Sequence, residues 1–428
     1  MATTVNMVTR LQMPKDSEKF HPYTTFESNG WSMPRLRINA NERDYSHTLE
    51  ISALYKADGT GTVRAFTPST YDDSGNRTSG GESVDIKWKD RLDPKKIAGI
   101  ATSSKYIIDL EEPDIRKARR KLVDKIKNKE QFTEDELKLL GVTDEAGAKT
   151  RLVESQKKHH EYISSYDFML AVKDILEKGE YKNRLFHIPK CKVNESYYQK
   201  KNTFYESIEP QWIYLADADA KEEATLSCDF YFGKDAVDVT ADGDKLIISG
   251  WIRAWVGKPF KEDKMIPKTI TYVKNGDSEM EKKRFEYLKN KLFVNDKDTL
   301  KCIALDLDLI DGSPRVAITL KDLPDDIREQ VELGFLTEEE AIRQNASGSY
   351  IRGDRVREQR FLNSKKQAED SVYTMKDTEL FSDTDSNEGL FDSTTDEVKE
   401  EQKTETKVDQ KVEEAAKDSS DEFDSLFG

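Results

Sequence analysis

Apolar and polar residues alternate along several short segments in the first quarter of the chain, as they do in strands that bury one face. The alternation predicts strands at residues 35–39, 46–56, 62–67, 83–89 and 105–110. Asp58-Gly59 lies between the second and third of these and predicts a hairpin, because the dipeptide tolerates the positive φ of a tight primed turn. We therefore expect an irregular arm over residues 1–34 and a small β-rich domain over residues 35–112.

Between residues 113 and 179 the apolar period changes from 2 residues to about 3.6, which predicts a helical module. The first helix has one apolar stripe, formed by Ile115, Ala118, Leu122 and Ile126. Residues 116–129 of the same helix carry 8 Lys or Arg and 1 Asp. Such a helix suits phosphate contacts, and it is equally typical of a solvated helix between two domains.

The strand pattern returns over residues 180–322. It predicts strands at 184–198, 203–215, 224–232, 245–256, 268–273 and 299–310 and a helix at 278–293. Short strands in this number with one inserted helix predict a five-stranded barrel of the oligonucleotide/oligosaccharide-binding (OB) type with an extra strand, and a generic β sandwich is the alternative. For residues 323–366, the pattern predicts a helical hairpin followed by a basic strand. The expected fold class is thus α+β, mainly β, with an OB-like barrel or barrels and a helical insertion.

The charge of the chain is concentrated at its C-terminal end. The 428 residues include 83 Asp or Glu and 68 Lys or Arg, a formal net charge of −15. Residues 367–428 hold 20 of the acidic and 6 of the basic residues, a net charge of −14, which leaves −1 for residues 1–366. Because this tail has no sustained apolar period, burial cannot offset the entropy of ordering it. We expect a disordered acidic C-terminal tail.

The large apolar residues of the tail recur in one short acidic pattern. The copies are Leu380-Phe381, Leu390-Phe391, and Phe423 with Leu426-Phe427. A tail that only improves solubility would explain the carboxylates but not the repeated Leu-Phe pair. The recurrence favours a repeated docking peptide for protein partners.

Several classes of function are disfavoured by the sequence. No apolar run approaches the roughly 18 residues that a membrane-spanning helix needs, and the first residues lack an apolar signal core. Cys191, Cys228 and Cys302 are far apart and odd in number, which argues against a disulfide framework and a zinc site. No catalytic or nucleotide-binding motif has the required spacing. We expect a cytoplasmic protein with no membrane contact, no catalytic activity, no cofactor and no metal.

Aromatic and basic residues gather at two places within residues 180–322. The first is a hairpin with Tyr197, Tyr198, Lys200, Lys201, Phe204 and Tyr205. The second is a strand in which Trp251, Arg253 and Trp255 alternate with apolar residues that suit a core, followed by Lys258. Rings stack on unpaired bases and cationic groups attract phosphates, so these are the candidate DNA-binding residues. Cross-strand packing explains either group alone about as well, but the two groups together less well.

The combination of an aromatic, basic barrel with an acidic tail that ends in a hydrophobic tip resembles single-stranded DNA-binding proteins of bacteria and, by its size and irregularity, those of bacteriophages. The stretch from His187 to Tyr198, continued at Ile213-Tyr214-Leu215, is similar to the opening hairpin of such a barrel. The resemblance covers residues 180–322 by pattern and 367–428 by composition. The chain departs from the bacterial pattern because it ends in Gly428 rather than Pro-Phe and repeats its tip peptide internally.

The resemblance implies a protein that binds single-stranded DNA without sequence specificity. It also implies recruitment of enzymes of DNA replication, recombination and repair through the tail tip, at Phe423, Leu426 and Phe427. For a bacteriophage protein, the site of action would be the cytoplasm of the bacterial host. The near-neutral body is less basic than a strong DNA binder requires. The alternative is therefore a structural or scaffolding protein whose exposed aromatic residues bind a protein partner.

Overall fold

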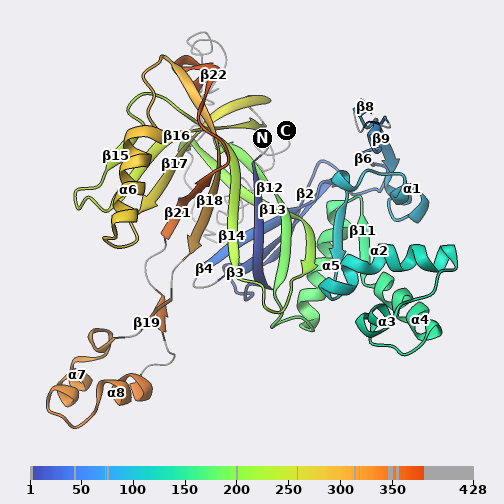
Figure 1. The fold of residues 1–428 in the computed structure, drawn as a ribbon, viewed down its shortest axis with the longest axis horizontal. Coiled ribbons are helices and arrows are strands. Elements are labelled where there is room, and N and C mark those ends of the chain that lie inside the picture. The colour runs from blue at the N-terminus through green and yellow to red at the C-terminus, as the bar shows by residue number, and fades with distance from the viewer. Residues whose placement is uncertain are drawn as a thin grey trace, which may run out of the picture.

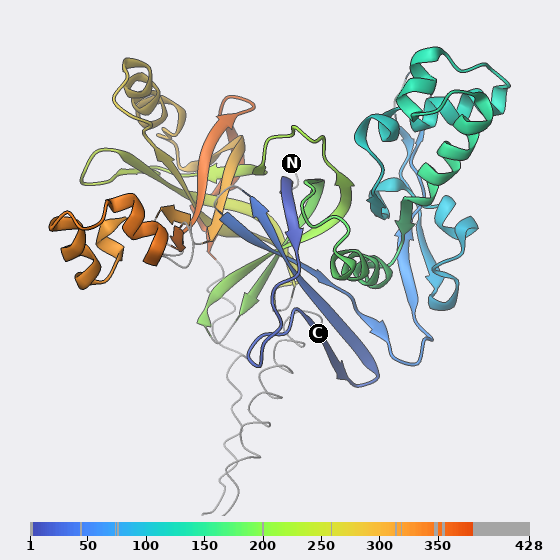
Figure 2. The same cartoon turned by 90° about the horizontal axis from the view of Figure 1, so that it is seen from below.

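The computed structural model describes residues 3–42, 45–72, 74, 77–198, 201–257, 259–312, 315–317, 319–345, 350–352 and 356–379. One 16-stranded sheet runs through the molecule, and most of the helices lie at its periphery (Figures 1 and 2). The expected class, α+β and mainly β, is confirmed.

Backbone pairing closes five strands into a first barrel. In order around the ring they are β1 (Thr4–Gln12), β3 (Trp31–Glu42), β4 (Tyr45–Ser52), β13 (Thr203–Leu215) and β12 (Phe186–Tyr198). The short strands β2 (Tyr23–Ser28) and β5 (Tyr55–Lys56) add to the edge of β3. Five closed strands are the number that an OB-type barrel requires.

A second ring of five strands follows. Its members are β14 (Glu223–Phe232), β16 (Lys245–Val256), β17 (Glu262–Val273), β21 (Val356–Ser364) and β18 (Thr299–Gly312). β15 (Val237–Val239) pairs with β16, and β22 (Glu369–Thr374) pairs with β18 and continues into the short helix η6 (Met375–Thr378). The two rings are joined where β1 pairs with β14 and β12 pairs with β16.

The barrels divide the chain differently from the boundaries expected from its sequence. Residues 1–34 are not an irregular arm, because Thr4–Gln12 forms β1, which buries Val5, Met7 and Leu11 and pairs with both β12 and β14. Residues 180–322 are not one barrel either. Their first two strands complete the first barrel, and the second barrel takes β21 from the segment expected to carry a helical hairpin and a basic strand.

The start of the tail also lies further along the chain than expected. The Ser371 hydroxyl donates to the Leu300 carbonyl over 2.8 Å, and Thr374 begins η6 with a capping box to Asp377. Residues 369–378 thus belong to the second barrel. The tail residues from Leu380 onward lie outside the described residues.

One hydrophobic core extends through both barrels. Inward positions of the strands supply fully buried rings such as Phe186, Phe230 and Phe232. Phe293 packs edge-on against the last two of these, from the end of the predicted helix, which forms as α6 (Glu279–Tyr287) and a π-helical turn η4 (Leu288–Leu292). The alternation of apolar and polar residues in the sequence thus predicts which side of each barrel strand faces the core.

A small lobe lies beside the first barrel. Its elements are β6 (Thr62–Phe66), β7 (Thr70–Tyr71), β8 (Arg77–Ser79), β9 (Ser83–Lys87), η1 (Trp88–Asp90), α1 (Pro94–Ala98) and η2 (Thr102–Ser104). The next strand, β10 (Tyr106–Asp109), joins the main sheet beside β13. The turn at Asp58-Gly59 forms, with Gly59 at a φ of 71° and the Thr60 amide donating to Asp58 Oδ1 over 2.9 Å. The predicted hairpin across it is wrong, because β4 and β5 pair with β3, whereas β6 pairs with β9.

Two helical parts complete the fold. The expected helical module contains α2 (Pro113–Asn128), α3 (Glu134–Leu140), α4 (Glu145–Lys157), β11 (His159–Tyr162) and α5 (Ser165–Lys178). The expected helical hairpin is α7 (Asp325–Glu332) and α8 (Glu338–Asn345), preceded by η5 (Leu320–Asp322). It projects from the second barrel on the pair β19 (Arg315–Ala317) and β20 (Tyr350–Arg352), as Figure 1 shows at lower left.

Candidate nucleic-acid interface

The strand β16 has the two-sided character that its sequence predicts. Ile252 and Val256 are buried in the core, and Ala254 is half-buried on the same side. Trp251, Arg253 and Trp255 therefore project from the opposite side, and the indole of Trp255 is 63% exposed. A strand that packs on one side only leaves its other side free to bind a ligand.

The β12–β13 hairpin contributes only part of its predicted aromatic group to the surface. Tyr197 is 3% exposed and donates its hydroxyl to Asn202 Oδ1 over 2.6 Å. Its ring centroid lies 5.2 Å from that of Phe204 and 5.1 Å from that of Phe260. Tyr197 and Phe204 are cross-strand partners on the core side, so the structure does not offer the buried Tyr197 ring to a base.

Tyr198 and Tyr205 lie on the solvent side of the same hairpin. Their rings meet edge to face with centroids 6.0 Å apart, and Tyr205 is exposed. The ammonium group of Lys201 lies 5.8 Å from the centre of the Tyr198 ring. Two rings and one cation of the predicted hairpin site thus face solvent, whereas Lys200 and Lys258 fall outside the described residues.

The structure brings the hairpin and the tryptophan strand onto one side of the sheet. β12 and β16 are neighbours with Glu195 opposite Val256, and both of these residues are buried. Because successive side chains of a strand point to opposite sides, Asn194 and Trp255 share the other side. We call this side the outer face and define it by Lys192, Asn194, Ser196, Tyr198, Tyr205, Trp251, Arg253 and Trp255.

Two tyrosines that the sequence analysis did not single out extend the outer face. Tyr231 of β14 is opposite Trp251, and its ring lies 5.5 Å from that of Tyr373 on β22. The guanidinium carbon of Arg253 lies 5.6 Å from the centre of the Tyr373 ring. Tyr231 alternates with the buried Phe230 and Phe232, so the strand pattern contained this signal. Tyr373 had none, because its segment was assigned to the tail.

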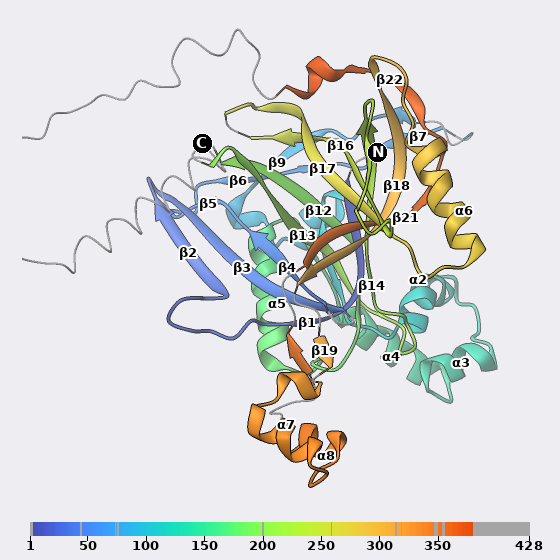
Figure 3. The ribbon, with the colours of Figure 1, turned by 90° about the vertical axis from the view of Figure 1, so that its left-hand side faces the viewer.

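The electrostatics of the outer face are mixed. Arg253 forms an ion pair of 2.7 Å with Asp263 on β17. Figure 3 shows β22 and η6 along the edge of the second barrel next to β18, and η6 packs against β17. The described chain ends at Glu379, directly after η6. The described chain thus ends a few residues after Tyr373, which lies on the outer face next to Tyr231 and Arg253.

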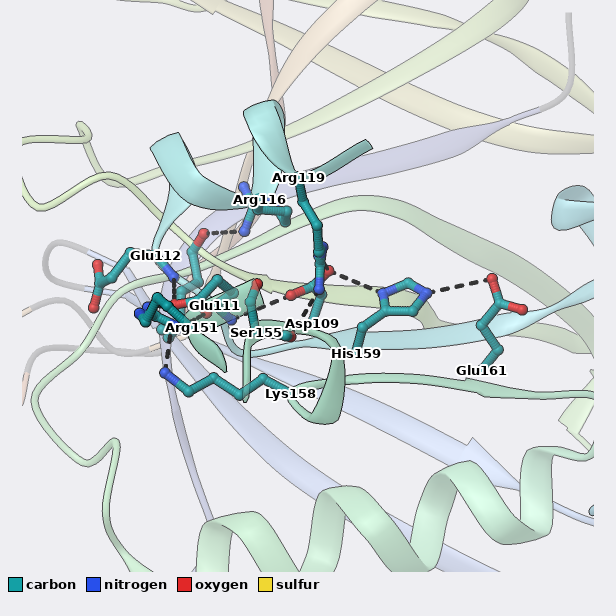
Figure 4. A network of polar contacts seen from close by, with 11 residues as sticks. Asp109, Glu111, Glu112, Arg116, Arg119, Arg151, Ser155, Lys158, His159 and Glu161 are labelled. Atoms are coloured by element: carbon teal, nitrogen blue, oxygen red, sulfur yellow. Dashed lines mark hydrogen bonds and ion pairs between the residues drawn. The ribbon is translucent and has the colours of Figure 1, made fainter. Parts of the chain in front are cut away.

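A second polar cluster connects the helical module to the sheet edge formed by β10 and β11 (Figure 4). Asp109 pairs with Arg119 of α2 and accepts a bond of 2.9 Å from His159 Nδ1, while His159 Nε2 lies 3.4 Å from Glu161. Burial alone lowers the pKa of His159, but the bonds with Asp109 and Glu161 outweigh it and raise the pKa to about 9.

The other half of this cluster is centred on Glu111, whose side chain is fully buried. Burial raises its pKa, but two bonds of 2.7 and 2.8 Å from Arg151, with backbone and hydroxyl donors, lower the pKa to about 2. In α2, Arg119 thus points inward, and Arg116 donates to the Leu215 carbonyl over 2.7 Å. These contacts favour a structural role for the charges of α2 over phosphate binding.

In the described part of the chain, no group of three or more His, Cys, Asp or Glu side chains is arranged to hold a metal ion. Cys191 and Cys228 are buried free thiols, and Cys302 is a half-buried one. Among the same residues, no helix is long and apolar enough to cross a membrane.

No protein-family model matches the chain, and no curated protein matches it. Among solved structures, the wild-type single-stranded DNA binding protein from Thermus aquaticus is similar with 8% sequence identity and a TM-score of 0.27, over 72% of this chain and 85% of that one. A deletion mutant of the same Thermus protein is similar with 7% identity and a TM-score of 0.26, over 72% and 86%. These scores are too low to equate the folds, so the interpretation of the outer face rests on this chain's own geometry.

Proposed function

We propose that the outer face binds single-stranded DNA without sequence specificity. The observation that carries the proposal is the placement of Tyr198, Tyr205, Trp251 and Trp255 on one solvent-facing side of adjacent strands, with Arg253 and Lys201 among them. Each base offers a π-face of about the same kind, so rings in a row bind a strand of any sequence. A duplex hides those faces, which restricts such a surface to unpaired nucleic acid.

The proposal includes recruitment of replication, recombination and repair enzymes through the acidic tail. It is supported by the repeated Leu-Phe pattern and by the position of Tyr373, shortly before the tail in the sequence, on the outer face. Residues 380–428 carry 16 acidic and 5 basic residues, a net charge of −11. An acidic peptide of this composition can insert Phe423, Leu426 and Phe427 into an apolar pocket while its carboxylates meet basic residues at the rim.

The bacteriophage origin implied by the resemblance, with action in the bacterial cytoplasm, is part of the same proposal. The scaffolding alternative keeps one argument in its favour, the near-neutral charge of residues 1–366. In that case the rings of the outer face would contact a protein surface rather than bases.

The deciding experiment is a titration of the full chain with fluorescently labelled oligothymidylate over a series of salt concentrations, with a duplex of equal length as comparison. Binding of the single strand, with log K falling linearly against log salt and weak binding of the duplex, supports the proposal. A full chain that is folded but binds neither nucleic acid at low salt would refute it and leave the scaffolding function.

A further inference from the structure

The small lobe next to the first barrel contains an open groove that is lined by its own residues. The cavity has a volume of about 750 Å³, and its wall includes Phe66 of β6, Tyr71 of β7, Arg77 of β8 and residues 101–105 around η2. Phe66 is 48% exposed and Tyr71 is 63% exposed. The groove thus combines two accessible rings with a guanidinium group.

Packing of the lobe does not require these rings. Ala65 and Ile86 face inward from β6 and β9 and form a separate core with Ile100 and Ile163. Phe66 follows Ala65 and therefore points to the other side of the strand. Exposed aromatic rings in a groove give a surface for contact with another molecule.

The groove is directly connected to the β12–β13 ribbon. Lys190 Nζ donates to the Ser103 carbonyl over 3.3 Å, and the Trp212 indole donates to the Lys105 carbonyl over 3.1 Å. The same ammonium group lies 5.0 Å from the centre of the Trp212 ring. Lys190 and Trp212 are cross-strand partners, so together they hold the η2 segment that forms one wall of the groove.

Alternate residues of β12 lead from Lys190, where the pairing with β13 is irregular, to the outer face. Lys190, Lys192, Asn194, Ser196 and Tyr198 are alternate residues of β12, and Asn194 lies beside Trp255. At about 3.3 Å per residue, the eight steps along the strand from Lys190 to Tyr198 span about 26 Å. One row of polar and cationic side chains thus connects the groove with the rings of the outer face.

We propose that the groove is a second stacking site for the same single strand of DNA that binds to the outer face. Bases stack on Phe66 and Tyr71, and Arg77, Lys190 and Lys192 contact phosphates along the row between the two sites. This inference rests on the proposed function and extends it to the length of the bound strand. In support, partial burial and the positive charge of the neighbouring Lys192 lower the pKa of Lys190. A phosphate next to both ammonium groups would relieve the repulsion between them.

The test compares a short oligothymidylate of about 8 nucleotides with a long one of about 24 nucleotides. One OB barrel usually covers about 4–16 nucleotides, so the short strand fits on one barrel and the long strand extends beyond it. The full chain with Phe66→Ala and Tyr71→Ala should lose at least about tenfold in affinity for the long strand. Its affinity for the short strand should not change, and its site size should decrease. A chain with Lys190→Ala, which leaves every residue of the outer face in place, should show a smaller salt slope on the long strand only.

A control variant removes equally accessible rings elsewhere, with Phe335→Ala and Tyr287→Ala, and should behave like the wild type. Folding of each variant is checked by circular dichroism and thermal unfolding. If the folded Phe66/Tyr71 variant binds the long strand with wild-type affinity and site size, the second site is refuted and the outer-face proposal stands. If the wild type binds neither strand, both proposals fail together.

Discussion

The substitution Trp255→Ala is the most direct perturbation of the outer face. The Trp255 side chain is 63% exposed on the free side of β16, so its removal opens no cavity and should cost little stability. A base that stacks on an exposed indole gains about 1–3 kcal/mol. Since 1.4 kcal/mol corresponds to a factor of ten, the dissociation constant should rise by about 5- to 140-fold.

Trp251 differs in a way that makes it a second, separate measurement. Trp251 is half-buried and lies opposite Pro267 and Tyr231 on the neighbouring strands. Because Trp251→Ala removes packing as well as a stacking surface, it should lower both the DNA affinity and the stability. The double variant should lose the sum of the two binding terms if the sites are independent, and less if one base bridges both rings.

The assay is the anisotropy of labelled oligothymidylate at a fixed salt concentration, with thermal unfolding of each variant measured in the same buffer. Trp31→Ala is the matched control, because Trp31 is an exposed tryptophan on β3, outside the outer face. Trp255→Phe should retain part of the affinity, since a smaller ring still stacks. Wild-type affinity in folded Trp255→Ala, or an equal loss in Trp31→Ala, would refute base stacking at this position.

Three further changes test other parts of the proposal. Lys201→Ala should reduce the slope of log K against log salt by about 0.7, the value for one phosphate contact on a single strand; an unchanged slope would place this lysine away from the DNA. Deletion of residues 380–428, which keeps β22 and η6, should tighten DNA binding at low salt by removing a competing polyanion, with a gain that shrinks as salt rises, whereas weaker binding would contradict this. Phe423→Ala with Phe427→Ala should weaken the capture of partner enzymes in pull-down assays without changing DNA affinity. Because bonds to Asp109 and Glu161 raise the pKa of His159 from 6.5 to about 9, its stabilising effect should be complete below pH 6.5 and lost as the pH rises through 9; His159→Gln should remove this dependence in urea unfolding, and exposed His160→Gln should not.

Local patterns in the sequence were sufficient for the inward and outward sides of individual strands. The alternation in β16 identified the free side with Trp251, Arg253 and Trp255, because successive side chains of any strand point to opposite sides. The same rule, applied to β12, separates the buried Tyr197 from the solvent-facing Tyr198. The Asp-Gly turn was also predictable, since it depends on residues that are close together in the chain.

The neighbours of each strand were decided only by the tertiary structure. β1 pairs with β12 and with β14, and β14 lies more than half the length of the chain further along the sequence. β21 joins a barrel whose other strands all come well before it in the sequence. Pairing of this kind depends on complementary hydrogen bonds and shared burial between distant segments, and no local period contains that information. For this reason the domain boundaries expected from the sequence do not coincide with the two barrels.

The proposed binding surface combines both kinds of information. Its rings were recognisable from composition and alternation, but their common side depends on the pairing of Glu195 with Val256 between β12 and β16. Tyr373 and the groove at Phe66 and Tyr71 became visible only once β22 and the small lobe were placed in space. The sequence determines which side chains can stack on a base, because that is a property of each residue and its strand; whether the stacking groups form one continuous surface is decided by long-range packing, which brings the strands together.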